Sequence, residues 1–211
     1  LQYHEVKVNV SFNDAGSGAN PFASTDFAAN GFSAKLYVDY IYLDTDERRR
    51  FAQITHEYLI EQLQFTGSQS FGAGDNNNIK LNLNHPVKCL VWVAKVSGNA
   101  GYEATGTTKL QLNGHDRFSE RAGSYFSMVQ PYQSFPNVPM LAAGGSQNIH
   151  TYSFGLKPAE HQPSGTCNMS RIDNAIMNVN NPGSAGTINI YAINYNVLRV
   201  MSGMGGLQYS N

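Results

Sequence analysis

The segment from Lys157 to Asn174, KPAEHQPSGTCNMSRIDN, constrains the fold more than any other part of the chain. Its two prolines fix the backbone and cannot donate ladder hydrogen bonds, so the chain must turn there. Ser164 and Gly165 extend the turn, and residues 166–179 follow as a predicted strand. A fixed corner that leads into a long strand is typical of the wall of a β-sandwich.

The same segment contains side chains that can also serve catalysis or metal binding. They are Glu160, His161, Cys167 and Asp173. Either reading is open from the segment alone, so the rest of the chain must decide between a structural corner and a site of chemistry.

Strand patterns recur along the whole chain. In residues 5–12, for example, Val6, Val8 and Val10 alternate with polar residues, as in a half-buried strand. Residues 56–65 fit either a helix or an extended segment, and we favour the extended one. The other predicted strands are residues 34–43, 79–83, 87–96, 109–113, 149–156, 166–179 and 187–200, with a break at His85-Pro86, because proline cannot lie inside a central ladder.

Helices are predicted to be short. Asp44 with Glu47 three positions later is a capping-box pattern, which predicts a helix over residues 45–53. Residues 124–130 fit one or two helical turns that end at Pro131. Long loops are expected over residues 13–33, 97–108 and 114–148.

About eight main strands with long, unequal connections favour a two-sheet jelly roll over an up-and-down barrel. We therefore predict an all-β fold, an eight-stranded jelly-roll sandwich with a short helix after the second strand and long loops. Residues 1–202 are expected to form one jelly-roll domain, and residues 203–211 a mobile C-terminal tail.

Composition excludes several kinds of partner. Charged residues make up 14% of the 211 residues and the net charge is −1, so the chain has no basic footprint for nucleic acid. No apolar run is long enough to predict a membrane span. The two cysteines do not form a disulfide framework and fit a reducing compartment.

Catalysis has little support in the sequence. The six histidines are widely spaced, and a His-x-His pair, which a jelly-roll metalloenzyme would need, is absent. His56-Glu57 begins like a helical zinc motif, but Ile60 stands at its closing position. We therefore expect no catalytic residue, no metal site and no cofactor, although a metal site assembled from distant residues stays open.

Several segments, in consistent order, carry a family resemblance. They are residues 1–6, 43–52, 113–118, 125–126, 130–132, 160–166, 170–175 and 191–199. Together they resemble the major capsid proteins of nucleocytoplasmic large DNA viruses, of the chlorovirus, iridovirus and mimivirus kind. The stretch EHQPSGT at residues 160–166 is the most specific of them.

The resemblance implies a structural protein of the virion. The family has two jelly rolls per subunit, and this chain is similar to the second, as a piece of a longer subunit; a single-jelly-roll capsid protein is the alternative. Three subunits form a pseudo-hexagonal capsomer, and capsomers tile an icosahedral shell assembled in the host cytoplasm. Minor capsid proteins are implied as further partners, without direct nucleic-acid contact or membrane insertion.

Subunit contacts are expected on the charge run and on the long loops. The interface candidates are Arg48, Arg49, Arg50, Arg117, Tyr125, Phe126, Tyr132 and Phe135. Two other functions stay open: a carbohydrate-binding jelly roll, with Tyr37, Asp39 and Tyr42 as the platform, and a metal-dependent jelly-roll enzyme.

Overall fold

The computed structural model of the protein describes residues 4–10, 33–96, 106–138, 149–181 and 185–210. The chain divides into two compact units. The first comprises Leu1–Glu57 with Arg199–Gly206, and the second comprises Tyr58–Leu198 with Leu207–Asn211. The second unit holds nearly all of the regular structure.

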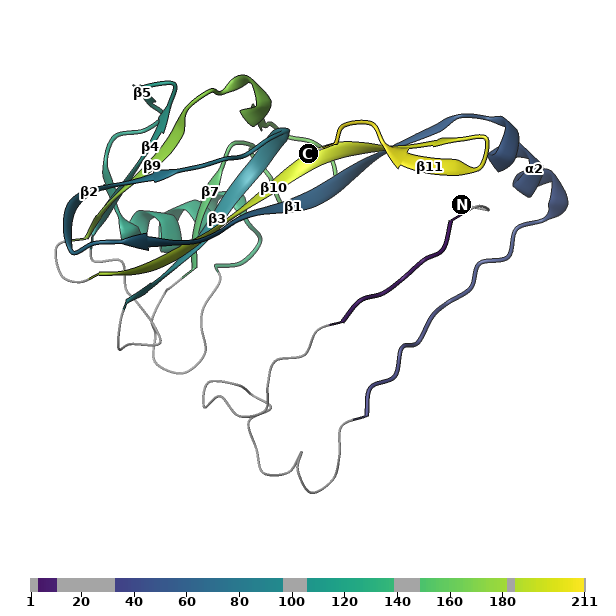
Figure 1. Ribbon diagram of the computed structural model, residues 1–211, viewed down its shortest axis with the longest axis horizontal. Helices are drawn as coiled ribbons and strands as arrows, with labels where there is room; N and C mark the ends of the chain where they lie inside the picture. Colours follow the sequence, from purple (N-terminus) through teal and green to yellow (C-terminus); the bar gives the residue numbers. More distant parts are fainter. Residues whose placement is uncertain (1–3, 11–32, 97–105, 139–148, 182–184, 211) are drawn as a thin grey trace. The chain divides into compact units, whose positions relative to one another are not determined.

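Two β-sheets contain the strands of the described residues, and most of their residues belong to the second unit (Figure 1). The first sheet has the order β1-β10-β3-β7, made of His56–Phe71, Gly186–Met201, Pro86–Val96 and Ile149–Ser153. The second has the order β2-β9-β4-β5, made of Gly74–Lys80, Ala175–Asn181, Thr107–Leu112 and His115–Asp116. Three short strands pair beside these paths: β8 (Cys167–Asn168) with β3, β11 (Met204–Leu207) with β10, and β6 (Arg121–Ala122) with β4.

This strand order confirms the predicted all-β jelly roll. The first long strand pairs with the last long strand, and the second pairs with the last but one. The longer strands alternate between the two sheets in chain order, as two Greek keys require: β1, β3, β7 and β10 lie in the first sheet, and β2, β4 and β9 lie in the second. The chain therefore closes into a sandwich of two main four-stranded paths.

The centre of the first sheet is the antiparallel pair β3 and β10. Its register runs from Gly186 opposite Val96 to Asn194 opposite Val87, with an irregularity after Ile193. Trp92 lies opposite Ile190, and both are almost completely buried. Because side chains alternate along a strand, every second residue of this pair faces the other sheet.

Aliphatic and aromatic side chains from both sheets fill the space between them. The ring of Phe126 lies 5.2 Å from the ring of Trp92 and 5.3 Å from the ring of Phe118, between centroids. The fully buried members of the cluster include Leu90, Leu110, Met169, Met177, Ile188 and Ile190. Removing these side chains from water is the main driving force of the fold.

Three local predictions are confirmed. Helix α2 spans Thr45–Gln53, and the side chain of Asp44 accepts a hydrogen bond of 2.8 Å from the backbone N–H of Glu47. Residues 56–65 are extended as the first part of β1. The break between β2 and β3 occurs at His85, whose φ is 64° and whose N–H donates to Ser170 Oγ.

The predicted strands 5–12 and 34–43 are wrong over the residues that the structure describes. Residues 4–10 and 33–44 carry no strand. A strand is defined by its ladder hydrogen bonds, and no other described segment pairs with either stretch. The alternation in the sequence therefore identified residues that favour an extended conformation, but no strand of the described residues pairs with them.

The long predicted strand 166–179 is interrupted. β8 is followed by a 3₁₀ turn, η2 (Met169–Arg171), before β9 begins at Ala175. Asn168 starts this turn by accepting a hydrogen bond from Ser170 N–H, and Ile172 N–H closes it on Met169. Local capping by an Asn side chain therefore overrides the strand pattern.

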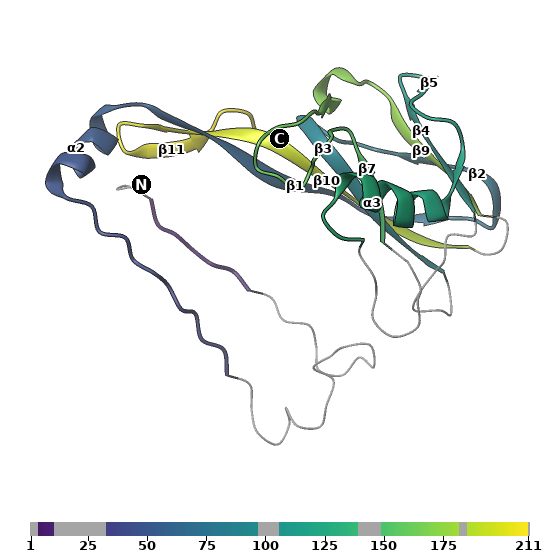
Figure 2. The ribbon, with the colours of Figure 1, turned by 180° about the vertical axis from the view of Figure 1, so that it is seen from behind.

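The helical prediction near residue 124 is right in place but wrong at its end. A π-helix, η1 (Tyr125–Val129), leads directly into α3 (Gln130–Ser134). Pro131 lies in the first turn of α3 rather than ending the helix. Figure 2 shows this helix beside β7.

Parts of the predicted loops and tail also have structure. The predicted loop 114–148 contains β5, β6, η1 and α3, and residues Met204–Leu207 of the predicted tail form β11. The segments 11–32, 97–105 and 139–148 lie outside the described residues.

The Pro/Gly corner closes on a second glycine. A Cβ added at Gly155 would lie 2.7 Å from the carbonyl oxygen of Gly165 and 2.9 Å from Ser164 Oγ. Gly165 has a φ of +143°, and its own added Cβ would lie 3.0 Å from Gly155 Cα. Ser164 Oγ also accepts a hydrogen bond from Lys157 N–H. Two backbones thus meet where only glycine leaves room.

We predict that Gly155→Ala lowers the free energy of unfolding by about 1–3 kcal/mol, because its Cβ collides with backbone that cannot rotate away. Gly72→Ala is the matched control, since its nearest neighbour would lie 3.6 Å away, an ordinary contact. Urea unfolding of the two purified variants measures the difference. Equal midpoints for both would show that the corner is not tight.

Candidate functional site

The groups that could perform chemistry are dispersed or inert. Burial raises the pKa of the Cys89 thiol to about 11 and also raises the pKa of Cys167, so neither is a thiolate at neutral pH. Within the described ranges, no three His, Cys, Asp or Glu side chains form a group that could hold a metal ion.

The acidic and histidine side chains of the Pro/Gly corner lie at the surface. Glu160 forms an ion pair of 3.0 Å with Lys157 Nζ, and His161 and Asp173 are exposed. These contacts fit a structural corner. In the part of the chain that is described, no helix is both long enough and apolar enough to cross a membrane.

The arginine candidates for subunit contacts all lie on the surface. Arg48, Arg49 and Arg50 are exposed on α2, where Arg49 lies 3.6 Å from Asp46. Arg117 is exposed beyond β5. Their guanidinium groups are thus available to a partner. The three arginines of α2 are consecutive in the sequence, whereas Arg117 comes from a separate region of the chain.

The aromatic candidates divide into a core residue and surface residues. Phe126 is 0% exposed, so its side chain belongs to the core and cannot itself touch a neighbour. Tyr125 and Phe135 are half-buried, and Tyr125 stacks under Arg121 at 4.5 Å. Tyr132 is 82% exposed on α3, near the exposed Met128 and Val129. This surface of η1 and α3 is partly apolar and accessible.

The predicted carbohydrate platform lies exposed along one extended stretch of the chain. Tyr37 and Tyr42 are 85% and 89% exposed, and Asp39 is also exposed. The ring of Tyr42 lies 6.4 Å from that of Tyr40, two residues earlier in the same extended stretch. This is the spacing of neighbours on one side of an extended chain.

The largest feature that the sequence prediction missed is the outer face of the first sheet. Its side chains alternate with the core-facing ones of β1, β10 and β3, and Phe65 stacks on Tyr191 at 4.7 Å. Leu63 is 65% exposed. We define the apolar outer face as Leu59, Leu63, Phe65, Val91, Val93, Tyr191 and Ile193.

One ion pair lies within this apolar outer face, because Glu61 alternates along β1 with Leu59, Leu63 and Phe65. Lys88 Nζ lies 2.6 Å from Glu61 Oε1, and the Lys88 side chain is only 5% exposed. The same ammonium lies 5.6 Å from the centre of the Tyr195 ring. Its charge is neutralised within the chain, so the apolar outer face presents no unbalanced charge to a partner.

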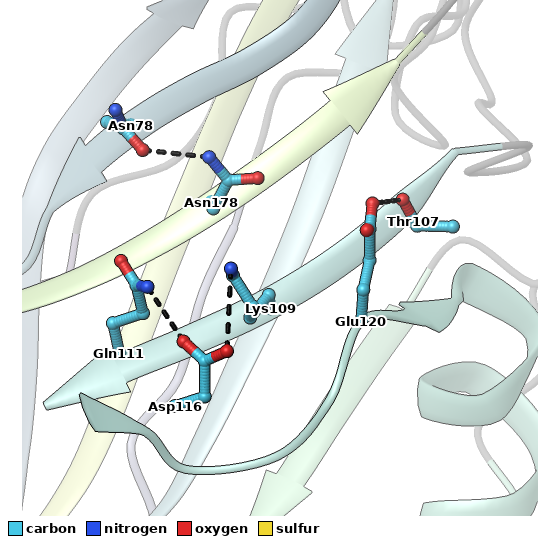
Figure 3. Close-up of polar contacts among 7 residues, drawn as sticks. All are labelled: Asn78, Thr107, Lys109, Gln111, Asp116, Glu120 and Asn178. Atoms are coloured by element: carbon cyan, nitrogen blue, oxygen red, sulfur yellow. Dashed lines mark hydrogen bonds and ion pairs between the residues drawn. The ribbon is translucent and has the colours of Figure 1, made fainter. Parts of the chain in front are cut away.

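The outer face of the second sheet has the opposite character (Figure 3). Asn178 donates to Asn78 Oδ1 at 2.8 Å, and Gln111 donates to Asp116 Oδ1 at 2.7 Å. Lys109 approaches the same carboxylate at 3.6 Å, and Thr107 bonds to Glu120. We define this polar outer face as Asn78, Thr107, Lys109, Gln111, Asp116, Glu120 and Asn178.

The two outer faces therefore suit different surroundings. Amide and carboxylate groups that bond to one another tolerate water, whereas a row of Leu, Phe, Tyr and Val side chains on a sheet gains free energy when covered. The signal was present in the sequence, because Leu59, Glu61, Leu63 and Phe65 occupy alternate positions within β1. Which side of β1 faces outward depends on the second sheet, which alternation cannot reveal.

Comparison with known proteins places these features in a family. The family described as "Large eukaryotic DNA virus major capsid protein" matches residues 47–206. The major capsid protein of Pyramimonas orientalis virus is 55% identical over all of this chain, and that of Paramecium bursaria Chlorella virus 1 is 43% identical. The chain spans 56% and 62% of their lengths, respectively.

Solved structures agree with the sequence comparisons. The "PBCV-1 virus capsid, quasi-atomic model" is 40% identical with a TM-score of 0.68, over 82% of this chain and 56% of that one. The Faustovirus major capsid protein shares the fold, with a TM-score of 0.60 at 11% identity over 75% of this chain and 36% of that one. The predicted resemblance is confirmed: this chain belongs to the family of large eukaryotic DNA virus major capsid proteins.

Proposed function

We propose that the protein is a structural subunit of the icosahedral shell of a large DNA virus. The observation that carries the proposal is the uncovered apolar outer face on one side of a rigid sandwich whose other side is polar. A shell subunit must bury one surface against neighbours, whereas a monomeric binding protein has no need of such a face. The names of the relatives, major capsid proteins, support the same role.

The proposal extends to assembly and place. Three copies of the full-length subunit form a pseudo-hexagonal capsomer, neighbouring capsomers tile the shell, and minor capsid proteins bind between them. The two-sheet unit serves as the second of two jelly rolls in the subunit. The protein acts in the virion after assembly in the host cytoplasm, without enzymatic activity, membrane insertion or direct contact with nucleic acid.

Chemical character argues for a protein partner at the apolar outer face. The two charges of its one ion pair, Lys88 and Glu61, neutralise each other, so neither a phosphate backbone nor a charged headgroup would gain from contact with it. Sheets pack face to face at about 10 Å through interdigitating apolar side chains. The apolar surface of β1, β10 and β3 is therefore suited to contact with another β-rich surface of the same shell.

We expect Leu63→Asp in the full-length subunit to abolish or strongly weaken capsomer assembly while leaving the monomer folded. An aspartate at this site would be desolvated in the assembled state without a partner, whereas in the monomer it stays hydrated. Sedimentation velocity measures the assembled fraction, and circular dichroism checks the fold.

The matched control is Asn78→Asp, which adds the same charge to the polar outer face. This variant should assemble about as well as the wild type, apart from any small loss that follows from a change in its stability. Normal assembly by Leu63→Asp would contradict the proposed contact, and so would equal loss in both variants.

A second pair of variants separates surface from core among the aromatic candidates. We predict that Phe126→Ala lowers the free energy of unfolding by about 3–5 kcal/mol, because it empties a fully buried site. Tyr132→Ala should cost less than about 0.5 kcal/mol of stability, since its side chain is mostly exposed, yet reduce assembly. Thermal unfolding and sedimentation of both variants test this, and a Tyr132→Ala variant that assembles normally would remove α3 from the interface.

A further inference from the structure

The end strand of the second sheet has an edge that no other strand of the described residues pairs with. β2 is bonded to β9 on one side only. Directly after β2, Leu81 N–H donates to the carbonyl oxygen of Ala175, the first residue of β9, at 2.9 Å. Because backbone groups alternate in direction along an extended chain, the N–H and C=O groups of Lys80 and Asn82 point away from β9. We define the β2 edge as residues 80–84.

Side chains from β1 occupy the β2 edge in place of a strand. Gln64 Nε2 donates to the carbonyl oxygen of Asn84 at 2.6 Å, and Gln64 Oε1 accepts from Asn84 N–H at 2.9 Å. Gln69 Nε2 donates to the carbonyl oxygen of Lys80 at 3.3 Å. A carboxamide offers the same kinds of donor and acceptor as a peptide group. Gln64 therefore makes with Asn84 the two bonds that a neighbouring strand would make.

An end strand of the first sheet is closed by a glutamine as well. Phe154, directly after β7, donates its N–H to the carbonyl oxygen of Lys88 in β3, so the N–H of Ser153 points away from β3. Gln130 Oε1, from α3, accepts from this Ser153 N–H at 3.3 Å. Gln130 Nε2 donates to the Tyr125 hydroxyl at 3.0 Å, which holds the carboxamide in place. One end strand in each sheet is thus bonded to a glutamine side chain.

The β2 edge would pair readily with another strand if it were uncovered. Its residues 81–84 read LNLN and carry no charge. Leu81 and Leu83 are buried and fix the segment to the core, whereas Asn82 and Asn84 are exposed. Proteins usually protect such an edge with charged side chains, proline or a bulge. At the β2 edge the two glutamines of β1 take that role.

We propose that the β2 edge is a latent strand-binding site, which Gln64 and Gln69 keep covered, and that its occupant when uncovered is the β2 edge of a second copy. Two identical segments can pair antiparallel about a two-fold axis. Centred on Asn82, this pairing places Lys80 opposite Asn84, so no like charges face each other. The glutamines thereby direct association away from this sheet edge and toward the outer faces. The inference holds whether or not the protein builds a shell.

Removal of both carboxamides from the protein tests the proposal. In Gln64→Ala/Gln69→Ala at low concentration, the Asn84 amide should exchange its hydrogen at least about 10-fold faster than in the wild type, because its acceptor is lost. At higher concentration this double variant should form more dimer than the wild type, and the exchange of the amides of residues 82 and 84 should become slow again. Sedimentation velocity measures the dimer fraction, and NMR measures the exchange of single amides.

Two further variants separate pairing at the β2 edge from a general loss of stability. Asn82→Lys, added to the double variant, places like charges opposite each other at the centre of the pairing. It should return the dimer fraction to the wild-type level while the Asn84 amide still exchanges fast. Gln111→Ala is the matched control, because Gln111 also bonds through its carboxamide but lies on β4, which has strand neighbours on both sides. This control should dimerise no more than the wild type.

Three results would overturn the proposal. The first is an Asn84 amide that keeps its wild-type protection in the double variant, because Gln64 would then not cover the edge. The second is a dimer fraction of the double variant that is no greater than that of the wild type. The third is association that Asn82→Lys does not reduce, because the contact would then lie on another surface.

Discussion

The pairing of β3 with β10 is the interaction on which the rest of the sandwich depends. Its register sends Leu90, Trp92 and Ile190 into the core, and the two strands that complete the sheet attach to its two sides. Each buried side chain of this size contributes about 1.5–3 kcal/mol. A slip of one residue would turn this entire set outward, so the core itself enforces the register.

The same pairing creates the apolar outer face, because a strand that sends every second residue inward must send the others outward. Tyr191 and Ile193 lie there as the necessary complement of Ile190 and Ala192. On the second sheet the outward-facing side chains are instead amides, carboxylates and other polar groups that bond to one another (Figure 3). The sandwich therefore has one apolar and one polar outer face, although side chains alternate in the same way along the strands of both sheets.

The sequence predicted well wherever a local signal and the tertiary environment agree. Asp44 with Glu47 located α2, and His85-Pro86 located the break before β3. The prediction failed at Asn168, where the side chain accepts a backbone hydrogen bond in place of a strand ladder. It also failed at Pro131, because whether a proline ends a helix depends on the helical turn that precedes it. The Asn113-Gly114 turn between β4 and β5 was visible as a hairpin signal that the prediction did not use.

Surface candidates were harder to predict than strands. Phe126 and Tyr132 have similar sequence surroundings, and only the packing of η1 and α3 places one in the core and the other in water. Residues 4–10 and 33–43 show the reverse case, since their strand pattern is strong but a strand also needs a neighbour. Long-range pairing is the information that a single sequence lacks in both cases.

The contact between Gly155 and Gly165 has a consequence for engineering. Because the two backbones touch, residues 156–164 form a loop that is already closed at its base, with Glu160 and His161 exposed. Lengthening such a loop costs little, about 0.6 kcal/mol for each doubling, provided that the closing residues are kept. A foreign peptide inserted between Glu160 and His161 would therefore extend from the surface without disturbing either sheet, which makes this loop a natural position for epitope display.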